Sequence, residues 1–342
     1  MKRTKQEVKK ALREKLHTAI ELEHSTIPPY LYAYWSVKDD TSEAAMSLLE
    51  VAKEEMNHMA MACNIMNAVG GYVNCANPNF IPSYPTELPG HSETVSSMKI
   101  GLHKLSKESI VGFLYIELPR DPNDDRDPQD GWTTIADFYL DILADIDELD
   151  DEDFNHGRQL NPTDSPDASG ILIPVQNKRD AKLCIAEIIE QGEGFSRAEE
   201  LSFSESDSLE PHYYRFLDIY KSMGGYGEVD LDDFNTEELI AKVDDTQYQE
   251  FMKGIHKLIS NPGKSDFDAP LYDKENLKFN SLYSYMLDNM HTHKEKRHPD
   301  MSAAIQTMFS LGRHAVAMRS IHLGDGQLGG PSFEYLNRAE RE

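Results

Sequence analysis

The sequence predicts an all-α protein built around an up-down helical bundle, with additional C-terminal helices and long ordered loops. In several long segments apolar residues recur every three or four positions, which is the period of an amphipathic helix. Strand signals are sparse, and no phosphate-binding glycine motif or nucleophile elbow is present. These observations favour helices packed on helices.

The first helix is predicted over residues 5–38, with a kink or short break at Pro28-Pro29. The second runs from a cap at Thr41 or Ser42 to about Val69, before Gly70-Gly71. Further helices are expected at about 102–117, from 133 or 134 onward, and at 178–191, 210–223, 236–260, 276–295 and 300–322. Loops are predicted at 72–100, 119–132 and 151–177, the last with one short strand at 171–173.

A chain of 342 residues fits one or two domains. Residues 1–230 are expected to form the bundle. Residues 231–342 are expected to add helices that pack on it within the same structural unit. With 39 % hydrophobic and 27 % charged residues, the chain has enough apolar material for a core.

The charge balance excludes two classes of partner. The formal net charge is -26, with 60 acidic against 34 basic residues. Such a surface repels nucleic acid, which binds through Lys and Arg, and it repels anionic membranes. No apolar run is long enough to span a bilayer, and no signal peptide is apparent. Three cysteines without a CxxC motif suggest reduced thiols and a cytoplasmic protein.

The strongest chemical signal is Glu55-Met56-Asn57-His58. Glutamate and histidine three positions apart share one helix face, so both can point at one ion. The apolar neighbours place the pair in or beside a buried face, where an ionised carboxylate is costly unless it is paired or bound to metal. Carboxylate and imidazole together suit Fe, Mn or Zn. The alternative is a structural Glu-His pair at the margin of the core.

Two further segments offer carboxylates. Glu23 lies in register with the apolar stripe of the first helix, where it would serve as a ligand or else be a solvent-edge residue. Glu187, Glu190 and Glu193 repeat every three residues. Three stacked carboxylates repel one another and favour a cation between them, although an exposed acidic face would show the same pattern.

His212 would be the second imidazole, although no Glu stands three positions before it. A carboxylate-bridged two-metal bundle uses four carboxylates and two histidines. Glu23, Glu55 and Glu190 with either Glu187 or Glu193, together with His58 and His212, reach that count for two ions. Glu117, at the end of an apolar helix before Pro119, could be a ligand or could accept a hydrogen bond from a ligating histidine, although the favoured interpretation is a helix-end carboxylate that makes a local hydrogen bond.

Several segments resemble the ferritin-like domain family of the iminophenyl-pyruvate dimer synthases. The resemblance begins with Leu22-Glu23-His24-Ser25-Thr26-Ile27-Pro28-Pro29-Tyr30-Leu31 and Glu54-Glu55-Met56-x-His58. It continues through Ile116-Glu117-x-Pro119, Thr134 to Tyr139, Glu190-Gln191-Gly192-Glu193-Gly194, His212 to Phe216, and Gly330 to Glu334. It covers most of residues 10–335.

The resemblance implies a ferritin-like bundle with a metal site at Glu23, Glu55, His58, Glu190 and His212. Named members act in bisindole pigment and indolocarbazole pathways, a form of natural-product biosynthesis in which tryptophan-derived imines are oxidatively coupled.

Three functions remain open from the sequence. The first is a non-haem di-iron or other di-metal oxidase or oxygenase, which uses O2 on a small amino-acid- or peptide-derived substrate. The second is an iron-oxidising or iron-storage protein with no organic substrate. The third is a non-catalytic helical scaffold. The sequence does not indicate the oligomeric state.

Overall fold

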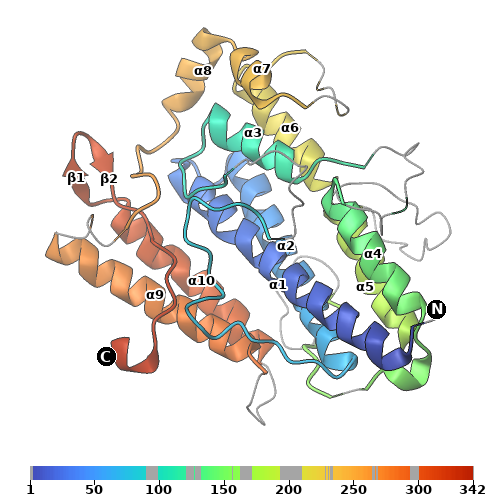
Figure 1. Ribbon diagram of the computed structural model, residues 1–342. Helices are drawn as coiled ribbons and strands as arrows, with labels where there is room; N and C mark the ends of the chain where they lie inside the picture. Colours follow the sequence, from blue (N-terminus) through green and yellow to red (C-terminus); the bar gives the residue numbers. More distant parts are fainter. Residues whose placement is uncertain are drawn as a thin grey trace.

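Ten α-helices and one small antiparallel sheet make up the described part of the chain, which is shown in Figure 1 as a computed structural model. The structure describes residues 3–89, 99–120, 127, 132–155, 157–161, 172–192, 210–227, 229, 231, 234–263, 266, 269–292 and 300–341. The helices are α1 (Lys5–Ser36), α2 (Glu43–Ala68), α3 (Lys107–Ile116), α4 (Ile135–Asp147), α5 (Lys178–Gly192), α6 (His212–Ser222), α7 (Thr236–Ala241), α8 (Asp245–Met252), α9 (Pro270–Met290) and α10 (Met301–Met318). The strands are β1 (His322–Gly324) and β2 (Gln327–Leu328), and short 3-10 turns lie at Asp151–Asp153 and Arg338–Glu340.

The long pair α1 and α2 forms the centre of the molecule, with α4 and α5 on one side (Figure 1). The α3 and α4 helices follow α1 one after the other. The backbone N–H of Leu105 donates to Ser36 Oγ at the C-terminal end of α1, so α3 begins there. Arg3, before α1, pairs with Asp145 near the end of α4. Both helices therefore run antiparallel to α1, as two pieces of a third bundle helix.

The α5 and α6 helices make up the fourth bundle helix in the same way, along α2. Gln191 in the last turn of α5 contacts His58, and Arg215 in the first turn of α6 contacts Glu54. The third and fourth bundle helices are thus both interrupted near the middle of α1 and α2. The predicted all-α, ferritin-like architecture is confirmed, with one long connection between α2 and α3.

Helix α1 is continuous through Pro28 and Pro29, so the predicted break there is wrong. Proline lacks the N–H that would bond four residues back, which leaves the carbonyl of Ser25 without its partner from Pro29. The Tyr84 hydroxyl donates to that carbonyl over 2.8 Å. The Thr26 hydroxyl donates to the Glu23 carbonyl over 2.8 Å. A neighbouring side chain therefore replaces the hydrogen bond that Pro29 removes.

Other predicted helices are present, although some boundaries are wrong: α3 begins at Lys107 rather than at 102, and α9 spans Pro270–Met290 rather than 276–295. Ser42 caps α2, and Thr134 caps α4 through Asp137. The helix predicted at 236–260 is instead two short helices, α7 and α8, because Val243 between them pairs with the backbone of Gly225. Residues 172 and 173 form no strand, and 171 lies outside the described residues. The β1–β2 hairpin was not predicted.

The C-terminal helices α9 and α10 pack on each other and dock on α1 away from α4 (Figure 1). Trp35 of α1 meets Phe279 of α9 and Phe333 of the C-terminal segment in an aromatic cluster. The Arg319 guanidinium donates to the Trp35 and Val37 carbonyls at the end of α1. Among the described helices, none combines the length and the apolar character that a bilayer span requires.

Candidate metal centre

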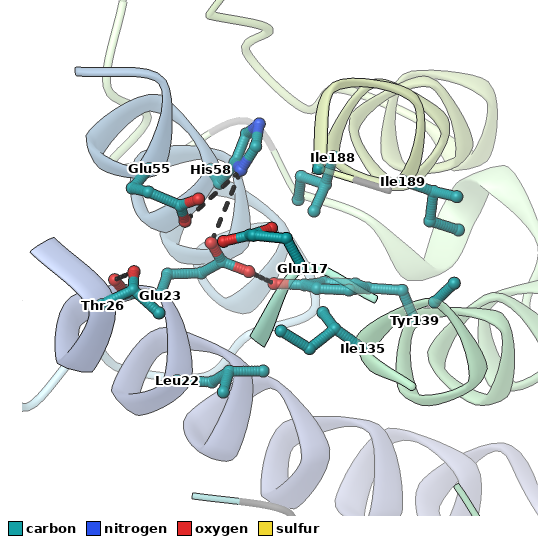
Figure 2. A pocket seen from close by; sticks show the side chains of 12 residues that line it. Leu22, Glu23, Thr26, Glu55, His58, Glu117, Ile135, Tyr139, Ile188 and Ile189 are labelled. Carbon is teal, nitrogen blue, oxygen red and sulfur yellow. Dashed lines mark hydrogen bonds and ion pairs between the residues drawn. The ribbon is translucent and has the colours of Figure 1, made fainter. Parts of the chain in front are cut away.

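Two groups of buried acidic and histidine side chains converge inside the bundle, level with the interruptions in its third and fourth helices. One group is Glu23, Glu55 and His58, and the other is Glu55, Glu117 and His212. Within each group the potential ligand atoms all lie within 4.8 Å of one another. Figure 2 shows Glu23 of α1, Glu55 and His58 of α2, and Glu117 at the end of α3 turned toward one another.

The first half of the centre joins α1 to α2. His58 Nδ1 lies 3.5 Å from Glu23 Oε2 and 3.7 Å from Glu55 Oε2. The Tyr139 hydroxyl of α4 donates to Glu23 Oε1 (Figure 2). That hydrogen bond fixes the carboxylate so that its second oxygen faces His58.

The second half joins α2 to the end of α3 and the start of α6. His212 Nδ1 lies 2.9 Å from Glu55 Oε1 and 3.5 Å from Glu117 Oε2. The Tyr30 hydroxyl donates to Glu117 Oε1 over 2.5 Å. The arrangement repeats the first half: a histidine, an outer glutamate and a tyrosine that holds that glutamate.

Glu55 belongs to both halves. Its Oε2 faces His58 and its Oε1 faces His212, and the two imidazole rings stack with their centroids 5.5 Å apart. A carboxylate with one oxygen directed to each of two histidine sites is the geometry of a bridging ligand between two ions.

The far nitrogen of each imidazole is held by a different partner. His58 Nε2 lies 2.9 Å from Gln191 Oε1 of α5. The Gln191 amide nitrogen donates to Glu187 Oε1 over 2.5 Å, which fixes the amide with its oxygen toward His58. Because Nε2 then carries the hydrogen in a neutral imidazole, Nδ1 presents a lone pair toward Glu23 and Glu55.

His212 is held by a charged group. Its Nε2 lies 2.9 Å from Glu54 Oε2, and Glu54 is in turn paired with Arg215, whose Nη1 lies 3.1 Å from the same oxygen. A carboxylate behind a histidine fixes its tautomer and raises its basicity, as is common for metal-ligating histidines.

The pKa values of the buried groups show that positive charge stabilises the cluster of carboxylates in the metal-free centre. Burial, the charge of Glu55 and other contacts raise the pKa of Glu23 to about 8. Burial alone would lower the pKa of His58, but Glu23 and Glu55 outweigh it and raise that pKa to about 10. Burial would also raise the pKa of Glu55, yet His212 and His58 bring it below its usual value. Protons thus supply the positive charge that a metal ion would otherwise provide.

The residues fit a metal pair by three further observations. His212 Nδ1 is buried and has no hydrogen-bond partner among the described residues, although two carboxylates lie close to it. Ligands about 2.1 Å from one ion lie roughly 3–3.4 Å apart, near the separations found in both halves. A cavity of about 20 Å³ adjoins Glu23, Glu55, His58 and Glu117, and it has room for a water molecule or an ion.

The predicted site residues divide into three sets. Glu23, Glu55, His58 and His212 come together as described above. Glu187 and Glu190 belong to neither group: Glu187 supports Gln191 instead, and Glu190 is half-buried on α5. Glu193 lies outside the described residues.

The favoured expectation of a local hydrogen bond at Glu117 is wrong, while its alternative as a ligand stays open, and sequence reasoning missed the supporting residues. Glu117 does not make the expected local hydrogen bond; it reaches across to Tyr30 and His212 instead. Its position at the end of an apolar helix before a proline was the available signal. Glu54 lies next to Glu55 and four residues before His58, and nothing in the local sequence predicts its contact with His212.

The rest of the cavity is mainly apolar. Its lining comes from α1, α4 and α5 and includes Leu22, Thr26, Ile135, Ala136, Ile188, Ile189 and Gly192 (Figure 2). A low-dielectric wall strengthens the interaction between carboxylates and any bound cation. The arrangement can hold two cations side by side and leave a small dry space next to them.

Comparisons with known proteins agree with this picture. No curated protein matches the sequence. Among solved structures, a ferritin-like protein from Caulobacter vibrioides is similar with a TM-score of 0.61 and 18 % sequence identity, over 94 % of this chain and 97 % of that one. At that identity the similarity concerns the fold alone. The sequence model of the Ferritin-like family matches residues 16–221, which include all five side chains of the two groups. The chain therefore belongs to the Ferritin-like family.

Proposed function

We propose that this protein is a non-haem di-metal oxidase or oxygenase, with two iron ions held between α1, α2, α3 and α6. The observation that carries the proposal is the position of Glu55, whose two oxygens face two separate histidines. Mn and Zn suit the same ligands, and an assay of bound metal distinguishes the three.

Each residue has a defined part in this proposal. Glu55 would be shared by the two ions, Glu23 and Glu117 would be the outer carboxylates, and His58 and His212 would face the ions with Nδ1. Bound iron would supply the redox chemistry needed to use O2. The chain contributes the geometry: Tyr139 and Tyr30 hold the outer carboxylates, and the apolar lining of the cavity keeps bulk water away.

The substrate proposed is a small amino-acid- or peptide-derived molecule, as part of natural-product biosynthesis in the cytoplasm. The resemblance of several sequence motifs to those of the iminophenyl-pyruvate dimer synthases motivates this choice. The three cysteines, Cys63, Cys75 and Cys184, are buried free thiols, which is compatible with a reducing compartment.

One observation favours a second candidate, an iron-oxidising protein without an organic substrate. The cavity beside the centre measures about 20 Å³, which matches a molecule the size of water or O2. Under this alternative, ferrous iron itself would be the substrate.

Metal content tests the site first. Protein purified without an affinity tag and loaded with ferrous iron should bind two ions per chain. His58→Ala should lose most of one while the helical signal stays unchanged. The exposed His17 on α1 provides the matched control, since His17→Ala should bind normally. Full metal occupancy in His58→Ala would refute the site. If the wild-type protein binds no metal, the non-catalytic helical scaffold is the function that remains.

Oxygen uptake then separates the two reactions. An oxidase or oxygenase consumes O2 catalytically only when a substrate is added to the iron-loaded protein. An iron-oxidising protein consumes O2 continuously when ferrous iron is supplied alone. Sustained turnover of ferrous iron without any organic compound would overturn the first proposal and support the second.

A further inference from the structure

A second, larger cavity lies on the other side of the molecule from α4 and α5, where the end of α1 meets α2 and α10. Its volume is about 410 Å³. That size is typical of a site for a small organic molecule. The cavity shares no lining residue with the cavity at the metal centre, so it is a separate site.

Aromatic and aliphatic side chains form most of its wall. Tyr34 and Trp35 come from α1 and Phe309 from α10, while Leu31, Leu49, Met308 and Val316 fill the positions between them. Phe309 is 45 % exposed, and the ammonium group of Lys53 lies 5.8 Å from the centre of its ring. Flat apolar walls of this kind suit a planar aromatic ligand.

Gly312 keeps the space beside Trp35 open. A Cβ at this position would lie 3.7 Å from Trp35 Nε1, so any longer side chain would extend beside the indole N–H. Glycine is unfavourable inside a helix such as α10. Because residue 312 is glycine, no side chain fills the part of the cavity next to the indole N–H of Trp35.

The cavity also carries hydrogen-bond donors that make no hydrogen bond to the described protein groups and are therefore available to a ligand. Trp35 is only 4 % exposed, and its Nε1–H makes no hydrogen bond within the described residues. Arg313 lines the cavity and has no ion-pair partner within the part of the chain that the structure describes. Arg319 is already held by backbone carbonyls, which leaves Arg313 and Trp35 as the available donors.

The local charge is opposite to that of the whole protein. Arg313 and Arg319 line the cavity together with a single acidic residue, Asp40, and Lys53 stands over Phe309. The chain as a whole has a formal net charge of -26. A cavity with positive charge and apolar walls attracts small anions, and the low dielectric constant of its walls strengthens that attraction.

We propose that this cavity binds a small aromatic carboxylate. The aromatic body lies against Tyr34, Trp35 and Phe309. The carboxylate accepts from the Arg313 guanidinium, which suits its geometry, and from Trp35 Nε1–H. Binding is non-covalent and independent of the metal centre.

Calorimetry with a matched pair of probes tests the proposal on the full-length, metal-loaded protein. The probes are 2-naphthoate and its uncharged analogue 2-naphthamide. The carboxylate should bind at least about tenfold more tightly, because only it pairs with Arg313. Arg313→Gln should remove that preference, while Arg338→Gln, which changes an exposed arginine elsewhere by the same charge, should retain it. Gly312→Leu should abolish binding of both probes.

The nuclear magnetic resonance signals of the indole N–H groups of Trp35 and Trp132 show where the probe binds. The chain has two tryptophans, so Trp132→Phe assigns the remaining signal to Trp35. Addition of 2-naphthoate should shift the Trp35 signal and leave that of Trp132 in place. Gly312→Leu should stay folded, as its metal content and Trp132 signal will show.

Three results would overturn the proposal. Equal affinity for the acid and the amide would exclude recognition of the charge. Unchanged binding to Gly312→Leu would place the ligand elsewhere. Dimerisation in sedimentation experiments that Gly312→Leu abolishes would show that a second copy of the chain, bound over Phe309 and Val316, occupies the cavity instead.

Discussion

The two halves of the metal centre use the same ligands but support them differently. On one side His58 is backed by the neutral Gln191 amide, which Glu187 orients. On the other side His212 is backed by the Glu54 carboxylate, which Arg215 holds. A carboxylate partner makes an imidazole more basic than an amide does. If the centre holds two ions as proposed, we expect the His212 half to bind its ion more tightly and to fill first.

The difference also shows which parts of the fold the centre depends on. The His58 half lies on the long, continuous helices α1 and α2. The His212 half lies where α3 ends and α6 begins, so Glu117 and His212 both come from helix ends. At that helix terminus the buried pair of Glu54 and Arg215 holds His212 in place.

The largest expected effect comes from Glu55, which the two halves share. Glu55→Gln should abolish binding of both ions, because neither half retains a charged bridging oxygen. Inductively coupled plasma analysis after gel filtration would measure the bound metal. Glu50→Ala on the exposed face of the same helix should bind normally. One tightly held ion in Glu55→Gln would mean that Glu55 does not serve both halves.

The next effect distinguishes the halves. Glu54→Gln should weaken the tighter ion by about 10–100-fold, whereas Gln191→Leu should weaken the other ion by about tenfold or less. Titration with ferrous ion under anaerobic conditions resolves the two affinities. Arg215→Met should accompany Glu54→Gln in a second variant, so that no buried guanidinium is left unpaired. A larger loss from Gln191→Leu would reverse the proposed order.

Raising the pH should strengthen metal binding in the half that contains Glu23 and His58. The pKa of Glu23 is raised to about 8 and that of His58 to about 10, so both groups hold protons at neutral pH that an ion must displace. Each displaced proton changes the apparent affinity by about tenfold per pH unit. Affinity should therefore increase between about pH 6 and about pH 8. A flat profile would contradict the shifted pKa values.

The same pKa values predict the opposite trend for the metal-free protein. A group whose pKa is raised on folding stabilises the fold fully below its unfolded pKa, and the contribution disappears as the pH rises through the folded value. Glu23 and His58 both follow this rule, so metal-free protein should lose stability as the pH rises from about 5 to about 10. The melting-temperature difference between loaded and metal-free protein should widen over that range.

The smallest effects should come from the two tyrosines. Tyr139→Phe removes the donor to Glu23, and Tyr30→Phe removes the donor to Glu117. Each hydroxyl makes one hydrogen bond to a carboxylate, so each variant should weaken its own half by only a few fold, on the order of 1 kcal/mol. The anaerobic titration measures both. An equal effect of either variant on both ions would argue against separate halves.

Local signals in the sequence were enough to predict the helices and much of the convergence. The period of apolar residues located α1 and α2, and it placed Glu23, Glu55 and His58 on their buried faces. The continuity of α1 through Pro28 and Pro29 depends on Tyr84, a residue from a distant loop, so no local rule could predict it.

The remaining parts of the centre depend on contacts between residues far apart in sequence. Glu117 and His212 meet Glu55 only because the third and fourth bundle helices are both interrupted at the same level. The position of Glu117 at the end of an apolar helix before Pro119 is a local signal, but the sequence alone does not show that His212 and Tyr30 lie beside it. The roles of Glu54 and Gln191 arise in the same way, since each acts on a histidine from another segment of the bundle.

The most direct measurement is anomalous diffraction at the iron edge from crystals grown with ferrous iron. Two peaks should flank the Glu55 carboxylate, one beside Glu23 and His58 and the other beside Glu117 and His212. At limiting iron, the peak beside His212 should be the stronger. Iron bound at Glu187 and Glu190, or only one peak at saturating iron, would contradict a two-metal centre bridged by Glu55.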